Sequence, residues 1–281
     1  MVTNSTTDWL THWFENPCLD LRSSDDFGAC HIRNTTSLPW SRLVNSMHEL
    51  PDKHQVLQLI GSSESLAEAT QFLSQKGYVI EQQIPSTPEF WQWAEQQQIT
   101  DSGCQSVPLW RANPRLIEHM DLIEQSTQGR RALDFACGAG RDAVYLAARG
   151  WDVTALDVKA DALSRCQALA DSMNCPIVTM QADMESGEDH LADQTFDLIV
   201  VMRYLHRPYL PTLIDHLNAG GVLCYSTFMV GCEQFGSPRN PNYLLQPNEL
   251  AQTFPQLTIL VNEEHRLADG RPIALFIAQK S

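Results

Sequence analysis

The sequence predicts an α/β protein of two domains, and two observations support this. Short apolar runs alternate with segments of helical spacing in two separate regions of the chain. Between those regions, residues 85–110 form a polar stretch rich in Pro, Gln, Ser and Thr. Because 281 residues are many for one domain and ordinary for two, we place a boundary near residue 105, giving domains 1–105 and 106–281.

In the first domain, residues 18–22 and 55–60 are apolar runs bounded by turn residues, which is typical of buried strands. Residues 65–77 have helical spacing, and Gly77 is placed to end that helix. This domain is therefore expected to alternate strands with helices.

The second domain contains more strand signals, with helical segments between most of them. This alternation predicts a parallel, doubly wound sheet with helices on both faces. The seven strand candidates are residues 131–136, 152–157, 176–181, 196–202, 221–228, 257–264 and 272–279.

Composition and charge narrow the possible functions. A formal net charge of −15 disfavours nucleic acid as a ligand and favours a small molecule. The N-terminus lacks a basic start followed by an apolar core, and no apolar stretch approaches the roughly 18 residues of a membrane span, so we expect a cytoplasmic protein without membrane contact. The eight Cys form no CxxC pair, which favours reduced thiols and no metal site.

The most informative stretch is "ALDFACGAGRDAVYLAARGWDVTALD", residues 132–157. Leu133–Phe135 are expected to end the first strand and Asp142–Arg149 to form the next helix. Gly138 and Gly140 lie in the turn between them, where the backbone can approach a ligand at the carboxyl end of the sheet.

Two carboxylates flank this turn. Asp134 precedes the glycines, and its charge would repel a pyrophosphate but attract a cation. Asp157 ends the second strand, where a carboxylate can accept hydrogen bonds from ribose hydroxyls. The pair suits a positively charged nucleoside that carries no phosphate, as S-adenosylmethionine does.

The segment "LDFACGAGRDA" resembles the first motif of class I S-adenosylmethionine-dependent methyltransferases, and the resemblance extends over residues 109–281. "RYLHRP" and "FGSPRNPNYLLQPNEL" resemble the tellurite-resistance-type subgroup, in which an acidic residue is common where Ser226 stands here. The resemblance implies a Rossmann-like seven-stranded methyltransferase fold with S-adenosylmethionine as cofactor. It implies these cofactor-binding residues: Asp134, Ala136, Gly138, Gly140, Asp157, Val158, Asp183 and Met184.

The loop "MRYLHRP" follows the fourth strand, where an acceptor would meet the methyl group. We assign catalytic roles there to Arg203, Tyr204 and His206, with His206 as a base if the acceptor atom is oxygen or nitrogen. Arg207, and Arg239 in a Pro- and Gly-rich loop, are candidates for substrate binding. The expected acceptor is a small molecule, with a thiol or another soft anion as the leading class.

The first domain resembles a rhodanese domain. "CLDLRSSDDFGACHIRNTTSLP", residues 18–39, matches the start of that pattern through Asp20, Arg22, Phe27, His31, Ile32 and Pro39. The rhodanese catalytic Cys is absent, because Leu59 stands at its position and Glu64 occupies the loop that should hold an anion. The resemblance therefore implies an inactive rhodanese-like domain that can position the second domain or bind a protein partner.

Three other functions fit part of the sequence. A noncatalytic S-adenosylmethionine-binding or regulatory protein would bind the cofactor without turnover. A tRNA-modifying methyltransferase is disfavoured by the acidity of both halves. An NAD-dependent oxidoreductase is disfavoured by Asp134 and by Ala143, which stands where a third Gly is usual.

Overall fold

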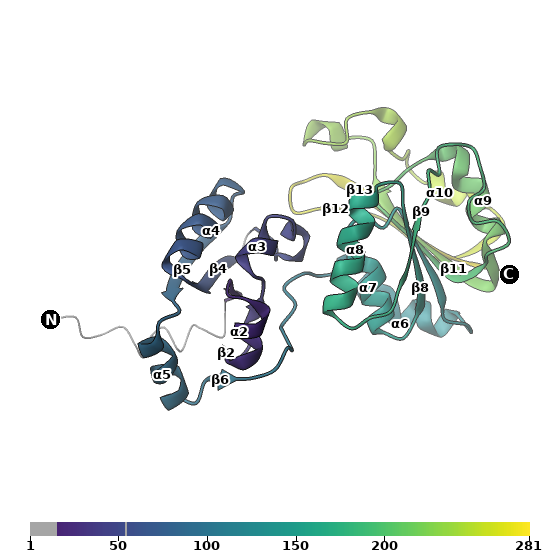
Figure 1. The fold of residues 1–281 in the computed structure, drawn as a ribbon. Helices are drawn as coiled ribbons and strands as arrows, with labels where there is room; N and C mark the ends of the chain where they lie inside the picture. Colours follow the sequence, from purple (N-terminus) through teal and green to yellow (C-terminus); the bar gives the residue numbers. More distant parts are fainter. Residues whose placement is uncertain (1–15, 54) are drawn as a thin grey trace. The chain divides into compact units, whose positions relative to one another are not determined.

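The computed structural model describes residues 16–53 and 55–281. The chain divides into two compact units, Met1–Arg111 and Ala112–Ser281, and each is described by itself (Figure 1). The division falls close to the boundary expected near residue 105.

The N-terminal unit contains a four-stranded parallel sheet of order β3-β1-β4-β5. Strands β2 and β6 pair antiparallel and form a separate two-stranded sheet. The strands are β1 (Cys18–Asp20), β2 (His31–Ile32), β3 (Thr36–Ser37), β4 (Val56–Gly61), β5 (Val79–Pro85) and β6 (Thr100–Asp101). The α-helices are α2 (Ser24–Ala29), α3 (Trp40–Leu43), α4 (Ser63–Gln75) and α5 (Pro88–Gln96).

Helix α4 follows β4 directly, and the sequence explains both of its ends. The Ser62 side chain accepts a hydrogen bond from the Ser65 amide at 3.1 Å and so caps the first turn. Gly77, at φ 88°, ends the helix in the left-handed region that glycine adopts without strain. The helix buries Leu66, Ala69 and Leu73 against the sheet.

The C-terminal unit is built on a seven-stranded sheet of order β12-β13-β11-β10-β7-β8-β9. All seven predicted strands are present. Their bounds are β7 (Arg131–Phe135), β8 (Asp152–Asp157), β9 (Val178–Gln181), β10 (Phe196–Met202), β11 (Leu217–Phe228), β12 (Leu257–Arg266) and β13 (Pro272–Lys280).

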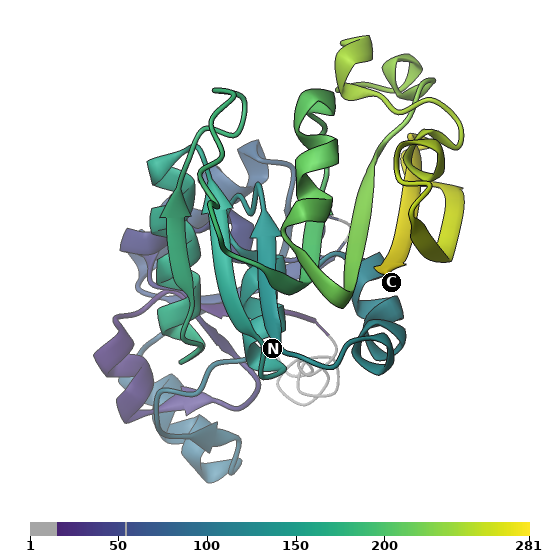
Figure 2. The same cartoon turned by 90° about the vertical axis from the view of Figure 1, so that its right-hand side faces the viewer.

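The prediction of a fully parallel sheet was wrong at one edge. Strand β13 runs antiparallel to both of its neighbours, β11 and β12. Figure 2 shows these last two strands in yellow at one edge of the sheet. The turn between β12 and β13 allows the reversal, because Leu267 and Arg271 close it with a backbone hydrogen bond of 2.9 Å.

Helices cover both faces of this sheet (Figure 1). Apolar residues of alternate strand positions form two cores, one beneath α6, α7 and α8 and the other beneath α9 and α10. The helix bounds are α6 (Pro114–Ser126), α7 (Arg141–Ala148), α8 (Ala160–Ser172), α9 (Leu210–Asp215) and α10 (Glu249–Thr253). Within the described part of the chain, no helix combines the length and apolar character needed to cross a bilayer.

The strand order places a crevice at the carboxyl edge of the sheet. From β7 the chain proceeds to β8 and β9 on one side, whereas β10 and β11 lie on the other side. Such a reversal of strand order opens the loops after the central strands, and ligands bind there in open α/β sheets.

Candidate functional site

The turn after β7 has an unusual backbone. Ala136, Gly138 and Gly140 have φ angles of 59°, 56° and 77°, all in the left-handed region. A side chain at Gly140 would overlap the Cys166 thiol of α8, so glycine is required for this close approach. A Cβ at Gly138 would meet nothing within 4 Å, so the backbone there is open to a ligand.

Asp157 holds this turn from the end of β8. Its Oδ2 accepts a hydrogen bond from the Gly138 amide, and its Oδ1 accepts one from the Lys159 amide, each at 2.9 Å. The side chain is buried, and each carboxylate oxygen retains a second lone pair. Asp157 can therefore fix the turn and still accept hydrogen bonds from a ligand.

Asp134 lies within the sheet and is only 2% exposed. Its Oδ2 has no hydrogen-bond partner among the described residues. Burial, followed by the charge of Asp142, raises the pKa of the Asp134 carboxyl well above its usual range. A buried carboxylate oxygen without a partner beside an open glycine turn fits a positively charged ligand.

The remaining predicted cofactor residues lie at the same edge of the sheet. Val158 follows β8 and is 49% exposed. Asp183 follows β9, and its Oδ1 accepts a hydrogen bond from the Glu185 amide at 2.9 Å. Met184 is buried in the core beneath α9 and α10, so its side chain packs inside the protein beside this edge of the sheet.

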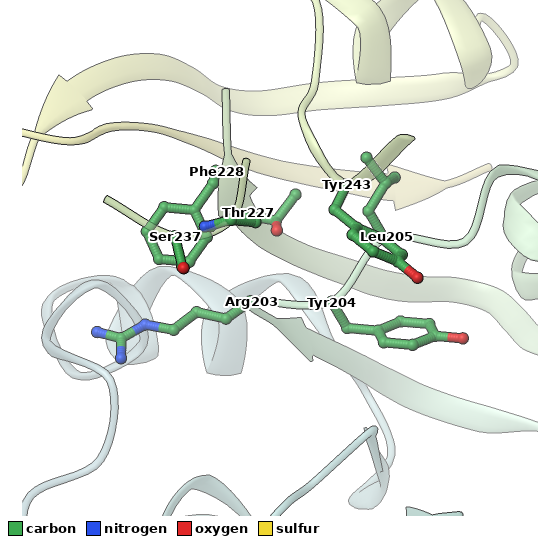
Figure 3. Close-up of a pocket in the computed structure, with 8 residues that line it drawn as sticks. Arg203, Tyr204, Leu205, Thr227, Phe228, Ser237 and Tyr243 are labelled. Carbon is green, nitrogen blue, oxygen red and sulfur yellow. The ribbon is translucent and has the colours of Figure 1, made fainter. Parts of the chain in front are cut away.

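A second feature of this edge is a cavity of about 380 Å³ at the ends of β10 and β11. Figure 3 shows its lining side chains around the adjacent residues Arg203 and Tyr204, which extend in opposite directions. The lining residues are Arg203, Tyr204, Leu205, Thr227, Phe228, Ser237, Pro238 and Tyr243.

Tyr204 connects the cavity with the turn after β7. Its ring packs against Phe135, the last residue of β7, with 5.6 Å between ring centroids. Its hydroxyl donates a hydrogen bond to Glu185 Oε1 at 3.3 Å, and the Tyr225 hydroxyl donates to its carbonyl at 2.8 Å. Burial, followed by the Glu185 charge, raises the pKa of the Tyr204 hydroxyl, so this group is protonated at neutral pH.

Arg203 has a strained backbone, with φ of 60°, held by a 2.7 Å hydrogen bond from its amide to the Ser226 carbonyl. Partial burial, followed by the charges of Arg141 and Arg271, lowers the pKa of its guanidinium. The charges of Asp142 and Asp269 act in the opposite direction, so both signs of charge surround this guanidinium.

Arg207 does not line the cavity. Its guanidinium pairs with both carboxylate oxygens of Glu249, at 2.6 and 2.9 Å, and donates to the carbonyls of Asn242 and Leu244. These contacts use four of its five N–H groups, so Arg207 is occupied with fixing the loop rather than free for an anionic substrate. Although burial opposes the effect, the ion pair lowers the pKa of Glu249.

The two other predicted residues also lie outside the cavity lining. The His206 side chain is partly buried and makes no hydrogen bond or ion pair with any described residue. Arg239 is exposed in the loop after β11. Ser226 is fully buried, and its hydroxyl donates to the Ala274 carbonyl of β13 at 2.8 Å, so it serves the sheet rather than the site.

Several residues of the site were missed at the sequence level. Arg271 donates to the Ser237 carbonyl at 2.8 Å, and its guanidinium lies 4.7 Å from the centre of the Phe228 ring. The backbone N–H of Asn113 donates a hydrogen bond to Asp142 Oδ1 at 2.6 Å, which fixes the start of α6 beside the start of α7. No local pattern marks such pairs, because their members are far apart in the chain.

Comparison with known proteins defines the class of the C-terminal unit. A family model described as "Methyltransferase domain" matches residues 132–221, which include the glycine turn and strands β7 to β10. Together with the homologues below and the Rossmann-like fold, this match shows an S-adenosylmethionine-dependent methyltransferase domain.

The probable S-adenosyl-L-methionine-dependent methyltransferase TehB of Haemophilus influenzae is 27% identical over 146 residues, covering 48% of this chain and 48% of TehB, or about half of each. The crystal structure of TehB from Haemophilus influenzae superposes with a TM-score of 0.51 at 21% identity, covering 60% of this chain and 63% of that one. Uncharacterized protein UNK4.09 of Schizosaccharomyces pombe is 24% identical and matches 95% of this chain and 94% of its own length.

Proposed function

We propose that this chain transfers a methyl group from S-adenosylmethionine to a small-molecule acceptor that binds in the cavity beside Tyr204. The observation that carries the proposal is the buried Asp134 carboxylate, whose Oδ2 lacks a partner next to the open Gly138 backbone. A cationic nucleoside satisfies that oxygen, whereas a pyrophosphate would be repelled by it.

The residues of the turn fit the parts of this cofactor. Asp134 would pair with a positive charge, and Asp157 would accept hydrogen bonds from the ribose hydroxyls while still holding Gly138. Asp183, which follows the neighbouring strand β9, would receive the adenine end. Val158 would lie along the nucleoside, since its side chain is exposed at the end of β8.

When bound, the cofactor supplies a methyl group that is already activated by its sulfonium. The chain must then align the acceptor with that methyl group and exclude water. Tyr204 suits this role because its ring lines the cavity and packs on Phe135 beside the turn after β7, and its protonated hydroxyl can orient an acceptor atom. A soft anion such as a thiolate would need no base. For a less acidic acceptor, His206, two residues after Tyr204 in the chain, would be the candidate base.

For the N-terminal unit, we propose a rhodanese-like domain without sulfurtransferase activity. The motif residues of that resemblance contact one another: Arg22 pairs with both oxygens of Asp20, at 3.0 and 2.6 Å, and the His31 ring stacks on Phe27 with 3.9 Å between centroids. These contacts give the motif residues a structural role that does not depend on enzymatic activity.

The position of the missing nucleophile supports the loss of activity. Leu59 is fully buried within β4, and only Ser62 separates β4 from α4, which leaves no loop to surround an anion. Burial raises the pKa values of Cys18 and Cys30, so their thiols are held protonated. A positioning or partner-binding role fits such a domain.

Calorimetric titration tests the cofactor half of the proposal. We expect the purified chain to bind S-adenosylmethionine and S-adenosylhomocysteine and to give no response to NADH. Turnover is then followed as S-adenosylhomocysteine production with acceptors of different classes, including thiols and bulk tRNA. Binding of NADH in place of the sulfur nucleosides would refute the proposal, and binding of both nucleosides without turnover on any acceptor would favour a regulatory protein.

A further inference from the structure

The cavity at the ends of β10 and β11 has a mainly apolar wall. Three aromatic side chains contribute to it, Tyr204, Phe228 and Tyr243, together with Leu205 and Pro238. Figure 3 shows Tyr204 on one side, with Tyr243 and Leu205 facing it from the other. A volume of about 380 Å³ matches a small organic molecule, since ligand pockets span roughly 300–1,000 Å³. A flat aromatic body would bury these rings, whereas a small inorganic oxyanion would leave them in contact with water.

One end of the same cavity is cationic. The Arg203 side chain extends away from Tyr204 (Figure 3), and its guanidinium makes no direct ion pair with a described residue, although the charges of Asp142 and Asp269 act on it. Arg271 lies near it but is paired with Asp269 at 2.8 Å, so Arg203 is the group with free donors. In a chain of net charge −15, an unpaired arginine at a cavity end attracts an anion from solution. Its planar fork matches a carboxylate with two parallel hydrogen bonds.

Both ends of the cavity border the methyl donor's turn, because Arg203 lies within electrostatic range of Arg141 and Asp142, which follow Gly140, and Tyr204 packs on Phe135 before Ala136. Tyr204 also hydrogen-bonds Glu185 beyond β9. A molecule anchored at Arg203 therefore presents its far end near Tyr204. That far end is where a methyl-accepting atom must lie.

We propose that the acceptor is a small aromatic carboxylate bearing a thiol or hydroxyl on its ring. Its carboxylate pairs with Arg203, its ring lies between Tyr204, Phe228 and Tyr243, and its ring substituent receives the methyl group. The substituent loses its proton to solvent, its lone pair forms the bond to the methyl carbon, and the electrons of the broken carbon–sulfur bond remain on sulfur. This inference rests on the proposed function, because it assumes a bound methyl donor.

The test compares 4-mercaptobenzoate with two ring thiols that lack its charge, 4-mercaptobenzamide and thiophenol. We expect kcat/KM for 4-mercaptobenzoate to exceed that for the amide by about tenfold or more, as a charge-assisted pair contributes roughly 1.5–3 kcal/mol. Arg203→Gln should abolish this preference, because it should lower kcat/KM for 4-mercaptobenzoate far more than for 4-mercaptobenzamide or thiophenol. Arg203→Lys should restore part of the preference, and Arg165→Gln on the exposed face of α8 should change nothing.

Calorimetry separates the two possible failures. If S-adenosylmethionine does not bind, the proposed function itself fails. If it binds but the benzoate and the benzamide react equally, or Arg203→Gln keeps the preference, the acceptor class is wrong and the methyltransferase proposal stands. Methylation of tellurite or selenite without methylation of any aromatic carboxylate would also overturn the acceptor class. Thermal melting of each variant shows that a lost preference does not reflect unfolding.

Discussion

The amide of Gly138 donates a hydrogen bond to Oδ2 of Asp157 at 2.9 Å, which ties the glycine turn after β7 to the end of β8. The other oxygen of the same carboxylate accepts the Lys159 amide. The Asp157 side chain thus holds the turn in shape and also offers its remaining lone pairs to a ligand. A substitution of Asp157 can therefore affect both the stability of the protein and its affinity for the ligand.

Asp157→Asn should weaken S-adenosylmethionine binding by about tenfold or more and lower the stability by about 1–2 kcal/mol. An amide has one acceptor oxygen, so its NH₂ group must face either the Gly138 or the Lys159 amide. Titration calorimetry and thermal melting measure the two effects. Asp152→Asn, at the exposed start of the same strand, is the control, and equal binding by both variants would remove Asp157 from the site.

Asp134→Asn should stabilise the ligand-free protein and weaken cofactor binding. Because the folded pKa of Asp134 is raised, its contribution to stability is present below the unfolded pKa, about 4, and is lost as pH rises through the folded value. We therefore expect the variant to melt about 3–6 °C higher than the original chain at pH 8 and to differ little at pH 4. A variant that melts lower at pH 8 would contradict this account.

Binding of the cofactor is also expected to release a proton from the Asp134 carboxyl. A cation bound beside Asp134 favours its ionised form, so binding of S-adenosylmethionine should expel a proton wherever the free protein holds one. Calorimetry in two buffers with different ionisation enthalpies should give different apparent binding enthalpies. In Asp134→Asn this buffer dependence should disappear, and its persistence would assign the proton to another group.

Glu249→Gln should impair acceptor use without changing cofactor affinity. The loop after β11 contributes Ser237, Pro238 and Tyr243 to the cavity, and the Arg207–Glu249 pair holds its far end. Loss of the pair should raise the acceptor KM by about fivefold, a cost near 1 kcal/mol. Glu264→Gln on the edge strand β12 is a matched control, and an unchanged KM would show that the pair is dispensable for the cavity.

Tyr204→Phe should lower kcat more than His206→Ala does. The Tyr204 hydroxyl lies at the cavity and contacts Glu185, whereas His206 lies outside the lining. We expect a loss of about tenfold for the tyrosine variant, and a change within about threefold, with an unaltered pH profile, for the histidine variant. Loss of a limb of the pH-rate profile in His206→Ala would instead establish His206 as the base.

The strands and the glycine turn could be predicted because their signals are local. An apolar run followed by Asp134 and Gly138, and a second run ending at Asp157, indicate strand ends that must meet at one edge of a sheet. The direction of β13 could not be predicted, since the periodicity of a strand carries no information about its direction. The pairing of Arg207 with Glu249 could not be predicted either, because 42 residues separate them and no local pattern links them.

The reversal of β13 has a consequence for the order in which the two halves of the site are assembled. Ile273, near the start of β13, pairs with Phe228 at the cavity, and the preceding turn supplies Arg271 to hold Ser237. Strands β7, β8 and β9 leave the ribosome long before this turn does. The glycine turn and Asp157 are therefore synthesised well before the last wall of the acceptor cavity, and both cores of the sheet are complete only when β13 adds Leu275 and Phe276.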